Sequence, residues 1–96
     1  MASFHDIILG SFDFAKTRNR FMSQFLTDEI RSQLIELTKD TKERIVTSFG
    51  DFVKIYNEVI FRLQKDVKYK KQSDLLRENY DQILETVYNF CMEKLY

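Results

Sequence analysis

The stretch from Ile30 to Val67 reads IRSQLIELTKDTKERIVTSFGDFVKIYNEVIFRLQKDV, and apolar residues recur along it at helical spacing. Its apolar ladder consists of Ile30, Leu34, Leu37, Ile45, Phe49, Phe52, Tyr56, Val59, Leu63 and Val67, with the polar Thr41 in the one gap. Steps of three and four residues keep side chains on one face, because a turn of α-helix takes about 3.6 residues. The pattern predicts long amphipathic helices that pack against the segments before and after.

Gly50 is the position at which this stretch is most open to interruption. Glycine is common just past a helix C-terminus, and the aspartate that follows is a good N-cap, so the pair favours two helices at 28–49 and 51–69. The apolar ladder keeps its phase across Gly50, however, and this favours one continuous helix over 28–69. The first alternative gives a compact four-helix protein and the second a longer three-helix shape. Thr27, followed by two acidic residues, predicts where the stretch begins.

The first segment, about 3–26, carries apolar residues on two neighbouring helical stripes. The stripes consist of Phe4, Ile8, Phe12 and Ala15, and of Ile7, Phe14, Phe21 and Phe25. An arc this wide exceeds what a surface helix needs against one neighbour. Either the helix is wedged between two others, or one stripe faces a second protein chain. In the second case the partner-binding residues are Phe4, Ile7, Phe12, Phe14 and Phe21. Ser3 is a candidate N-cap, and Gly10 marks a kink or a close contact between helices.

The segment at about 51–69 ends in a basic cluster that consists of Arg62, Lys65, Lys68, Lys70 and Lys71. Such a cluster is most often a solvated helix end, and contact with an anionic membrane surface is the alternative. We expect the next loop at 70–72, with Ser73 as the N-cap of a last helix at 74–95. Residues 50–72 carry six basic and three acidic side chains, whereas residues 73–96 carry two and five. This opposite charge predicts an antiparallel hairpin.

The sequence contains no proline and only two glycines. Folds rich in β-structure need turn residues at short intervals, whereas long helices do not. We therefore expect an all-α fold, a single domain over 1–96 that is built as an antiparallel bundle of three or four helices. The expected helices cover about 3–26, 28–49, 51–69 and 74–95. Local ion pairs are expected between Glu36 and Lys39 and between Asp40 and Arg44.

Charge and composition narrow the class of function. Fifteen Lys and Arg residues balance fifteen Asp and Glu residues. Because phosphate neutralisation supplies most of the affinity of nucleic-acid binders, a neutral chain is not expected to be one. No apolar run of about 18 residues predicts a transmembrane helix, and the first residues lack the basic region of a secretory signal. The lone Cys91 cannot form an internal disulfide, which favours the cytoplasm or another reducing intracellular compartment.

Side chains that carry chemistry are sparse. The one histidine, His5, is expected to be exposed near the N-terminus, and the one cysteine, Cys91, is expected to be buried on the apolar face of the last helix. Neither glycine belongs to a phosphate-binding loop. Carboxylate pairs at helical spacing are typical of a solvated helix face. We therefore expect no catalytic residues and no metal or cofactor.

Two segments resemble known families. Residues 42–90 are similar to helical hairpins of vesicle-tethering complex subunits such as the exocyst family, on the residues Lys42-Glu43-Arg44, Phe49, Phe52, Leu76-Arg77-Glu78, Ile83, Tyr88 and Phe90. This resemblance covers about half of the chain. It implies a role in protein assembly or membrane tethering, with Lys68, Lys70 and Lys71 at the membrane. Residues 21–46 resemble helices of the ligand-binding half of TetR-type regulators, although the DNA-binding helix-turn-helix of that family is not present.

The leading hypothesis is a non-enzymatic interaction or assembly module whose amphipathic helices pack against a protein partner or a second copy. It is motivated by the wide apolar arc of the first segment. The alternatives are a helical subunit or fragment of a membrane-tethering complex, and a small regulatory bundle that holds an apolar ligand between Phe and Tyr side chains. A third class is a membrane-surface or nucleic-acid binder that uses the basic cluster.

Overall fold

The computed structural model describes residues 2–94. Within that range the chain forms six α-helices, two short 3₁₀ helices and one two-stranded sheet. In chain order the elements are β1 (Ala2–Ser3), α1 (Phe4–Lys16), α2 (Arg20–Phe25), α3 (Asp28–Thr38), η1 (Lys39–Thr41), β2 (Ile45–Val46), α4 (Phe49–Gln64), η2 (Val67–Tyr69), α5 (Lys70–Glu78) and α6 (Tyr80–Lys94). The prediction of an all-α fold is confirmed, whereas the predicted number and bounds of the helices are wrong.

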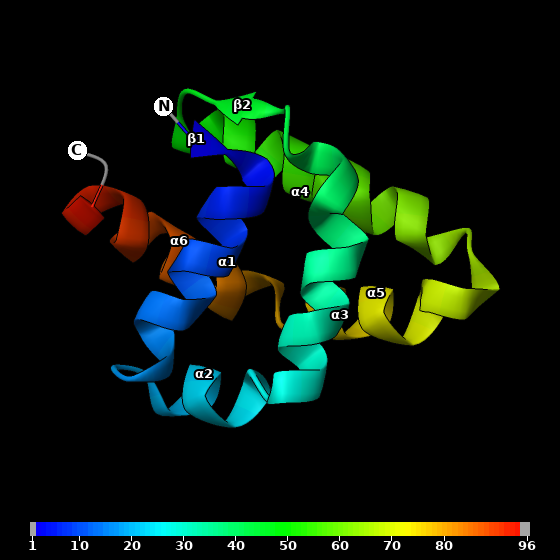
Figure 1. The fold of residues 1–96 in the computed structure, drawn as a ribbon, viewed down its shortest axis with the longest axis horizontal. Coiled ribbons are helices and arrows are strands. Elements are labelled where there is room, and N and C mark those ends of the chain that lie inside the picture. Colours follow the sequence, from blue (N-terminus) through cyan, green and yellow to red (C-terminus); the bar gives the residue numbers. More distant parts are fainter. Residues whose placement is uncertain (1, 95–96) are drawn as a thin grey trace.

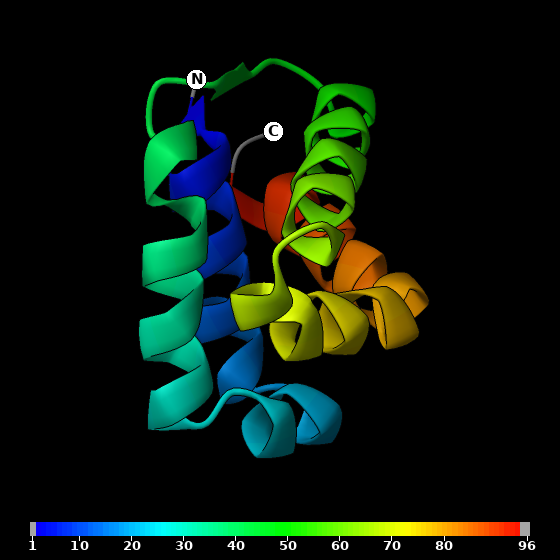
Figure 2. The same ribbon diagram turned by 90° about the vertical axis from the view of Figure 1, so that its right-hand side faces the viewer.

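The helices form two layers (Figure 1, Figure 2). α1 and α3 lie side by side and run in opposite directions, with α2 joining them at one end. α4 crosses in the second layer, and the chain then doubles back through α5 into α6, which packs against α1. β1 pairs with β2 in antiparallel register, with Ala2 opposite Val46 and Ser3 opposite Ile45. This small sheet ties the N-terminus to the connection between α3 and α4.

The core lies between the two layers and is rich in aromatic rings. Phe4 of α1 stacks on Phe52 of α4 with ring centres 4.7 Å apart, and Phe52 stacks on Tyr56 at 5.9 Å. Fully burying one large apolar side chain stabilises a protein by about 1.5–3 kcal/mol, so these three rings contribute several kcal/mol to the stability of the core. The buried members of the predicted apolar ladder are Leu34, Leu37, Phe52, Tyr56, Val59 and Leu63, and the polar Thr41 in its gap is buried as well. Ile45 and Val67, in contrast, are exposed.

The first predicted helix, 3–26, is interrupted after Lys16. Asn19 begins α2 as its N-cap, and its side-chain oxygen accepts a hydrogen bond from the Met22 amide at 3.2 Å. Asparagine competes in this way with helical hydrogen bonding, which ends one helix and starts another. The apolar stripes keep their spacing across the turn, and periodicity alone therefore misses it.

The central stretch is broken, but not at Gly50. α3 ends at Thr38, and Ile45–Val46 form a strand instead of a helix. Ser48 then caps α4, because its hydroxyl accepts a hydrogen bond from the Asp51 amide at 3.1 Å. Gly50 lies inside the first turn of α4. The expectation of a break is right, its position is wrong, and one continuous helix is excluded. The cap and the strand pairing outweigh an apolar pattern that runs through them.

The turn between the third and fourth predicted segments comes earlier than expected. Asp66 caps η2 by accepting a backbone hydrogen bond at 3.0 Å. The predicted loop at 70–72 is helical, and Ser73 is buried inside α5 rather than serving as an N-cap. The last segment is split at Asn79, whose side-chain amide donates to the Leu75 carbonyl at 2.9 Å. The predicted reversal of the chain is nevertheless present (Figure 1).

Three local predictions are confirmed. Ser3 and Thr27 each cap a helix, and their hydroxyl oxygens accept hydrogen bonds from the backbone amide three residues on, at 3.1 and 3.2 Å. An acidic residue follows each cap in the first turn, as the sequence shows. Glu36 and Lys39 form the expected ion pair at 3.0 Å. Local signals of this kind depend on residues a few positions apart, and they are therefore readable without tertiary information.

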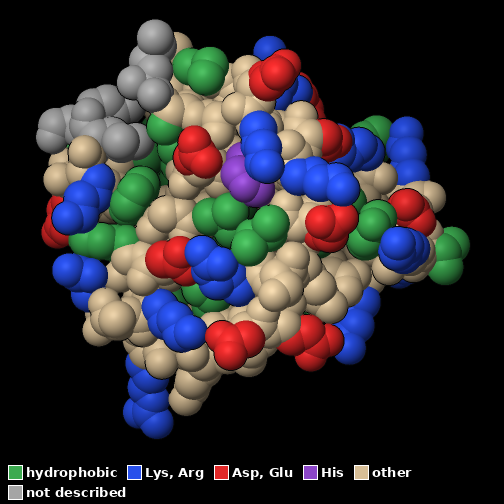
Figure 3. Space-filling view, viewed as in Figure 1, with side chains coloured by type: hydrophobic (Ala, Val, Ile, Leu, Met, Phe, Trp, Pro, Cys, Tyr) green, Lys and Arg blue, Asp and Glu red, His purple; other side chains and the backbone are tan. Residues whose placement is uncertain are grey.

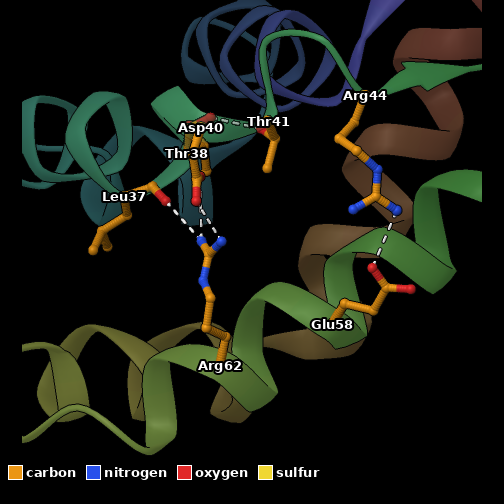
Figure 4. A network of polar contacts seen from close by, with 7 residues as sticks. All are labelled: Leu37, Thr38, Asp40, Thr41, Arg44, Glu58 and Arg62. Atoms are coloured by element: carbon orange, nitrogen blue, oxygen red, sulfur yellow. Dashed lines mark hydrogen bonds and ion pairs between the residues drawn. The ribbon is translucent and has the colours of Figure 1, made fainter.

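Other ion pairs join the two layers (Figure 4). The predicted pair of Asp40 with Arg44 is not formed. Asp40 instead binds Arg62 of α4, while Arg44 pairs with Glu58 at 3.1 Å. Arg62 also donates to the Leu37 carbonyl at 3.4 Å. Because η1 ends at Thr41, Asp40 and Arg44 do not share a regular helix, and both side chains turn toward α4.

Gly10 marks a close contact between helices. A Cβ atom at this position would lie 3.0 Å from Cζ of Phe90 on α6. α1 continues through Gly10 without interruption. The close-contact alternative is therefore the right one, and the glycine sets how near α1 and α6 approach.

Candidate interaction surfaces

The predicted partner-binding residues divide into a buried and a half-buried group. Phe4, Ile7 and Phe12 are buried inside one chain. Exposing all three would cost about 6 kcal/mol at about 2 kcal/mol each, which rivals the whole stability of a small domain, about 5–15 kcal/mol. As partner-binding residues these three are a wrong assignment, because they pack the core. Phe14 and Phe21 are half-buried and pack against neighbouring rings.

The outer face of α6 presents a stripe of acidic and apolar side chains. Tyr88 and Met92 are 47% and 51% exposed, and Asp81 and Glu85 are exposed as well. The four residues follow one another at steps of four, three and four, which places them on one side of the helix. The buried Val87 lies on the opposite side and faces the core. We call Asp81, Glu85, Tyr88 and Met92 the α6 stripe.

Aromatic rings from other helices extend the apolar end of the α6 stripe. Phe49 of α4 meets Tyr88 edge to face, with ring centres 5.4 Å apart. Next to Met92, Phe14 of α1 lines a groove between α1 and α6. The guanidinium of Arg18 lies 4.0 Å from the centre of the Phe14 ring. The apolar end thus combines aromatic rings with a polar rim, which is the composition of many protein-binding surfaces.

A second surface lies at the turn between α4 and α5, at one end of the longest axis of the molecule (Figure 1). Two apolar side chains are exposed here, Val67 at 91% and Phe61 at 62%. Figure 3 shows hydrophobic and basic side chains together at this end. We define the α4–α5 tip as Phe61, Lys65, Val67, Lys68, Lys70 and Lys71.

The predicted basic cluster is only partly brought together. Arg62 binds Asp40 and so belongs to the contact between the layers rather than to the α4–α5 tip. Lys70 pairs with Asp74, one turn along α5, at 3.5 Å. Four lysines of the predicted cluster therefore remain at the tip.

A small apolar cavity lies between α3 and α5. Its lining includes Leu34, Leu37, Gln72 and Leu76. Its volume is about 10 Å³, whereas ligand pockets usually span about 300–1,000 Å³. The Gln72 Oε1 atom is buried and has no hydrogen-bond partner among residues 2–94. A ligand would enter this cavity only if the two helices moved apart.

His5 is buried rather than exposed, which corrects the sequence expectation. Its Nδ1 lies 2.9 Å from the Thr38 Oγ1 atom. The Thr38 hydroxyl donates to the Leu34 carbonyl at 2.7 Å, so its oxygen accepts from the imidazole. The pairing of β1 with β2 holds the N-terminus in place and thereby buries His5. Cys91 is buried as predicted, and burial raises the pKa of its thiol.

Comparisons with known proteins identify no relative of this chain. It matches no protein-family model, no curated protein and no solved structure. Within residues 2–94, no three His, Cys, Asp or Glu side chains are grouped so as to hold a metal ion. No helix in the same range is long and apolar enough to cross a membrane. The resemblances to tethering subunits and to TetR-type regulators stay expectations.

The exposed apolar residues of both surfaces escape the sequence analysis for identifiable reasons. The apolar ladder assigns Val67 to the buried face, but α4 ends at Gln64 and helical phase does not extend past it. Tyr88 and Met92 are four residues apart and lie off the buried face of α6. An aromatic residue and a methionine together on the polar face of a helix are a signal that the sequence does contain.

Proposed function

We propose that this chain is a non-enzymatic protein-interaction module and that a helical partner packs along the α6 stripe. The observation that carries this proposal is the joint exposure of Tyr88 and Met92 on one helix face. Phe14 and Phe49, both half-buried, lie beside them. Tyrosine and methionine are enriched in the centres of protein interfaces, where large and adaptable side chains are buried together.

The charge of this face indicates the chemistry of the partner. Asp81 and Glu85 precede the apolar pair along the helix and are exposed, whereas the cations Arg18 and Lys94 lie over the Phe14 ring at the apolar end. An amphipathic helix with Lys or Arg beside its apolar face complements both properties. One helix face buries less than about 800 Å² on each partner, so we expect a weak, transient complex. A second copy of the chain is the competing occupant.

An NMR titration with a synthetic amphipathic peptide of leucine and lysine tests this proposal. We expect amide shifts along the α6 stripe and in the first turn of α4, and their loss in the double variant Tyr88→Ser, Met92→Ser. The matched control is Phe61→Ser, which removes an exposed apolar side chain at the α4–α5 tip and leaves binding unchanged. Shifts confined to other surfaces, or no shifts at all, would overturn the proposal.

Spectra of the protein alone, recorded over a dilution series, test the competing occupant. A heterologous partner predicts that the α6 stripe keeps its shifts as the protein is diluted. Changes on dilution that are confined to Asp81, Glu85, Tyr88 and Met92 would assign the stripe to a second copy of the chain instead.

A further inference from the structure

The α4–α5 tip exposes apolar side chains where the fold has no need of them. Val67 begins η2 after α4 has ended, and it is 91% exposed. Phe61 lies one turn before the end of α4 and is 62% exposed. Single exposed apolar residues are ordinary on protein surfaces. Two of them among four lysines, at one extremity of the molecule, form a combined apolar and cationic surface (Figure 3).

The lysines of the tip lie near aromatic and apolar side chains, and Lys70 and Lys71 line one groove with Val67. The Nζ atom of Lys65 lies 4.3 Å from the centre of the Phe61 ring, and that of Lys68 lies 5.2 Å from the centre of the Tyr69 ring. Lys71 is exposed on the first turn of α5.

The acidic groups on the tip segment itself are three, and a fourth, Glu36, lines a groove with Lys68 and pairs with Lys39. Asp66 is used as the cap of η2, Asp74 pairs with Lys70, and Glu78 lies at the far end of α5. The four lysines of the tip outnumber the three acidic side chains of its own segment, and the tip keeps a local positive charge in a chain of zero net charge.

We infer that the α4–α5 tip docks on an anionic lipid membrane, with Val67 entering the boundary between headgroups and acyl chains and the lysines contacting the headgroups. A lipid interface takes up apolar side chains from a protruding turn, and its anionic headgroups attract nearby cationic side chains. A protein partner would need a concave surface to enclose such a tip. Nucleic acid fits less well, because Lys65 and Lys68 lie over the aromatic rings that bases would stack on. The inference is independent of the α6 stripe, which lies on a different helix.

A single-tryptophan reporter gives the most direct test, since the chain contains no tryptophan. Val67→Trp is mixed with vesicles of phosphatidylcholine alone and of phosphatidylcholine with phosphatidylserine, at low salt. We expect a blue shift of the fluorescence and quenching by brominated acyl chains only with the anionic vesicles. Met92→Trp, on the α6 stripe, is the matched control and is expected to show neither. Because both positions are exposed, neither substitution threatens the fold.

Sedimentation with the same vesicles separates the contributions of charge and apolar contact. Each lysine near an anionic leaflet raises partitioning about fivefold, so Lys65→Gln, Lys68→Gln and Lys71→Gln together should lower it about 100-fold. Val67→Ser should lower it about tenfold. Lys42→Gln, Lys54→Gln and Lys94→Gln together remove the same charge elsewhere and should leave partitioning nearly unchanged.

Three results would overturn the inference. The first is no binding to anionic vesicles at low salt. The second is an equal loss of binding in both triple-lysine variants, which would mean diffuse attraction rather than a docking tip. The third is tighter binding to a single-stranded oligonucleotide than to vesicles with the same dependence on the tip lysines, which would assign the tip to nucleic acid. None of these outcomes bears on peptide binding at the α6 stripe.

Discussion

Tyr56 is the buried residue whose polar group has the clearest structural use. Its hydroxyl donates to the Leu76 carbonyl at 2.9 Å. Leu76 lies in the last turn of α5, where carbonyls have no partner within the helix. Burial raises the pKa of Tyr56, so the hydroxyl keeps its proton and remains a donor. The contact ties the end of α5 to the middle of α4.

Tyr56→Phe should lower the free energy of unfolding by about 1–2 kcal/mol, because it leaves the Leu76 carbonyl without its donor. Urea denaturation followed by circular dichroism measures this. Tyr88→Phe is the matched control, since Tyr88 is half exposed, and it should leave the free energy of unfolding unchanged. Equal stability of Tyr56→Phe and the wild type would show that the hydrogen bond contributes nothing.

A second single residue, Asp13, makes the free energy of unfolding depend on pH. Arg31 donates two hydrogen bonds to its carboxylate, at 2.8 and 2.9 Å, and these lower the pKa of Asp13. A carboxyl whose pKa is lowered by folding stabilises the protein above its unfolded pKa, and that contribution is lost as the pH falls through the lowered pKa. Both side chains are partly exposed, so we expect about 0.5 kcal/mol.

Asp13→Asn should therefore be less stable than the wild type at neutral pH. The difference should begin to shrink below about pH 4 and vanish only below the lowered pKa of Asp13. Thermal unfolding across a pH series measures it. In an Arg31→Gln background the same substitution should have no effect at any pH. A difference that persists in acid would point to a cause other than this ion pair.

At the scale of elements, the two glycines both lie in helices but differ in the space around them. Gly10 faces Phe90 across the contact of α1 with α6, whereas Gly50 is exposed and its nearest neighbour would be the Ser48 hydroxyl, 3.7 Å from an added Cβ. Neither glycine has a positive φ. Alanine stabilises a helix by about 1 kcal/mol relative to glycine where space permits.

Gly50→Ala should thus raise the free energy of unfolding by about 1 kcal/mol. The free energy of unfolding of Gly10→Ala should be lower than that of Gly50→Ala by at least about 1 kcal/mol, because the new methyl group overlaps the Phe90 ring. Removing the ring with Phe90→Ala should bring the effect of Gly10→Ala close to that of Gly50→Ala. Similar effects of both glycine substitutions in the wild type would contradict the close contact.

This sequence predicts where helices occur better than it predicts where they begin and end. Periodicity locates the apolar faces of α3, α4 and α6, and the caps at Ser3 and Thr27 are readable in short windows. The breaks at Asn19, Ser48 and Asn79 keep the apolar spacing nearly in phase, so the pattern that predicts the helices also hides their ends. The strand Ile45–Val46 exists only because the N-terminus pairs with it, which no local signal reports.

At the scale of the whole molecule, the two candidate surfaces lie on different elements. The α6 stripe is acidic and apolar, and the α4–α5 tip is basic and apolar. The sequence contains the basic cluster in plain form, but the assignment of Phe4, Ile7 and Phe12 to a partner surface fails. A wide apolar arc is equally consistent with a helix covered on several sides by its own chain, and only the tertiary packing distinguishes the two.

Light scattering over a concentration series tests the central claim, that the Phe-rich arc is closed within one chain and that interaction is left to the exposed surfaces. We predict a monomer mass of 11.6 kDa that does not change with concentration. A dimer mass that persists on dilution, and that survives Tyr88→Ser with Met92→Ser, would contradict it. The core would then be completed by a second chain, which is the alternative in which one stripe of the Phe-rich arc faces another protein.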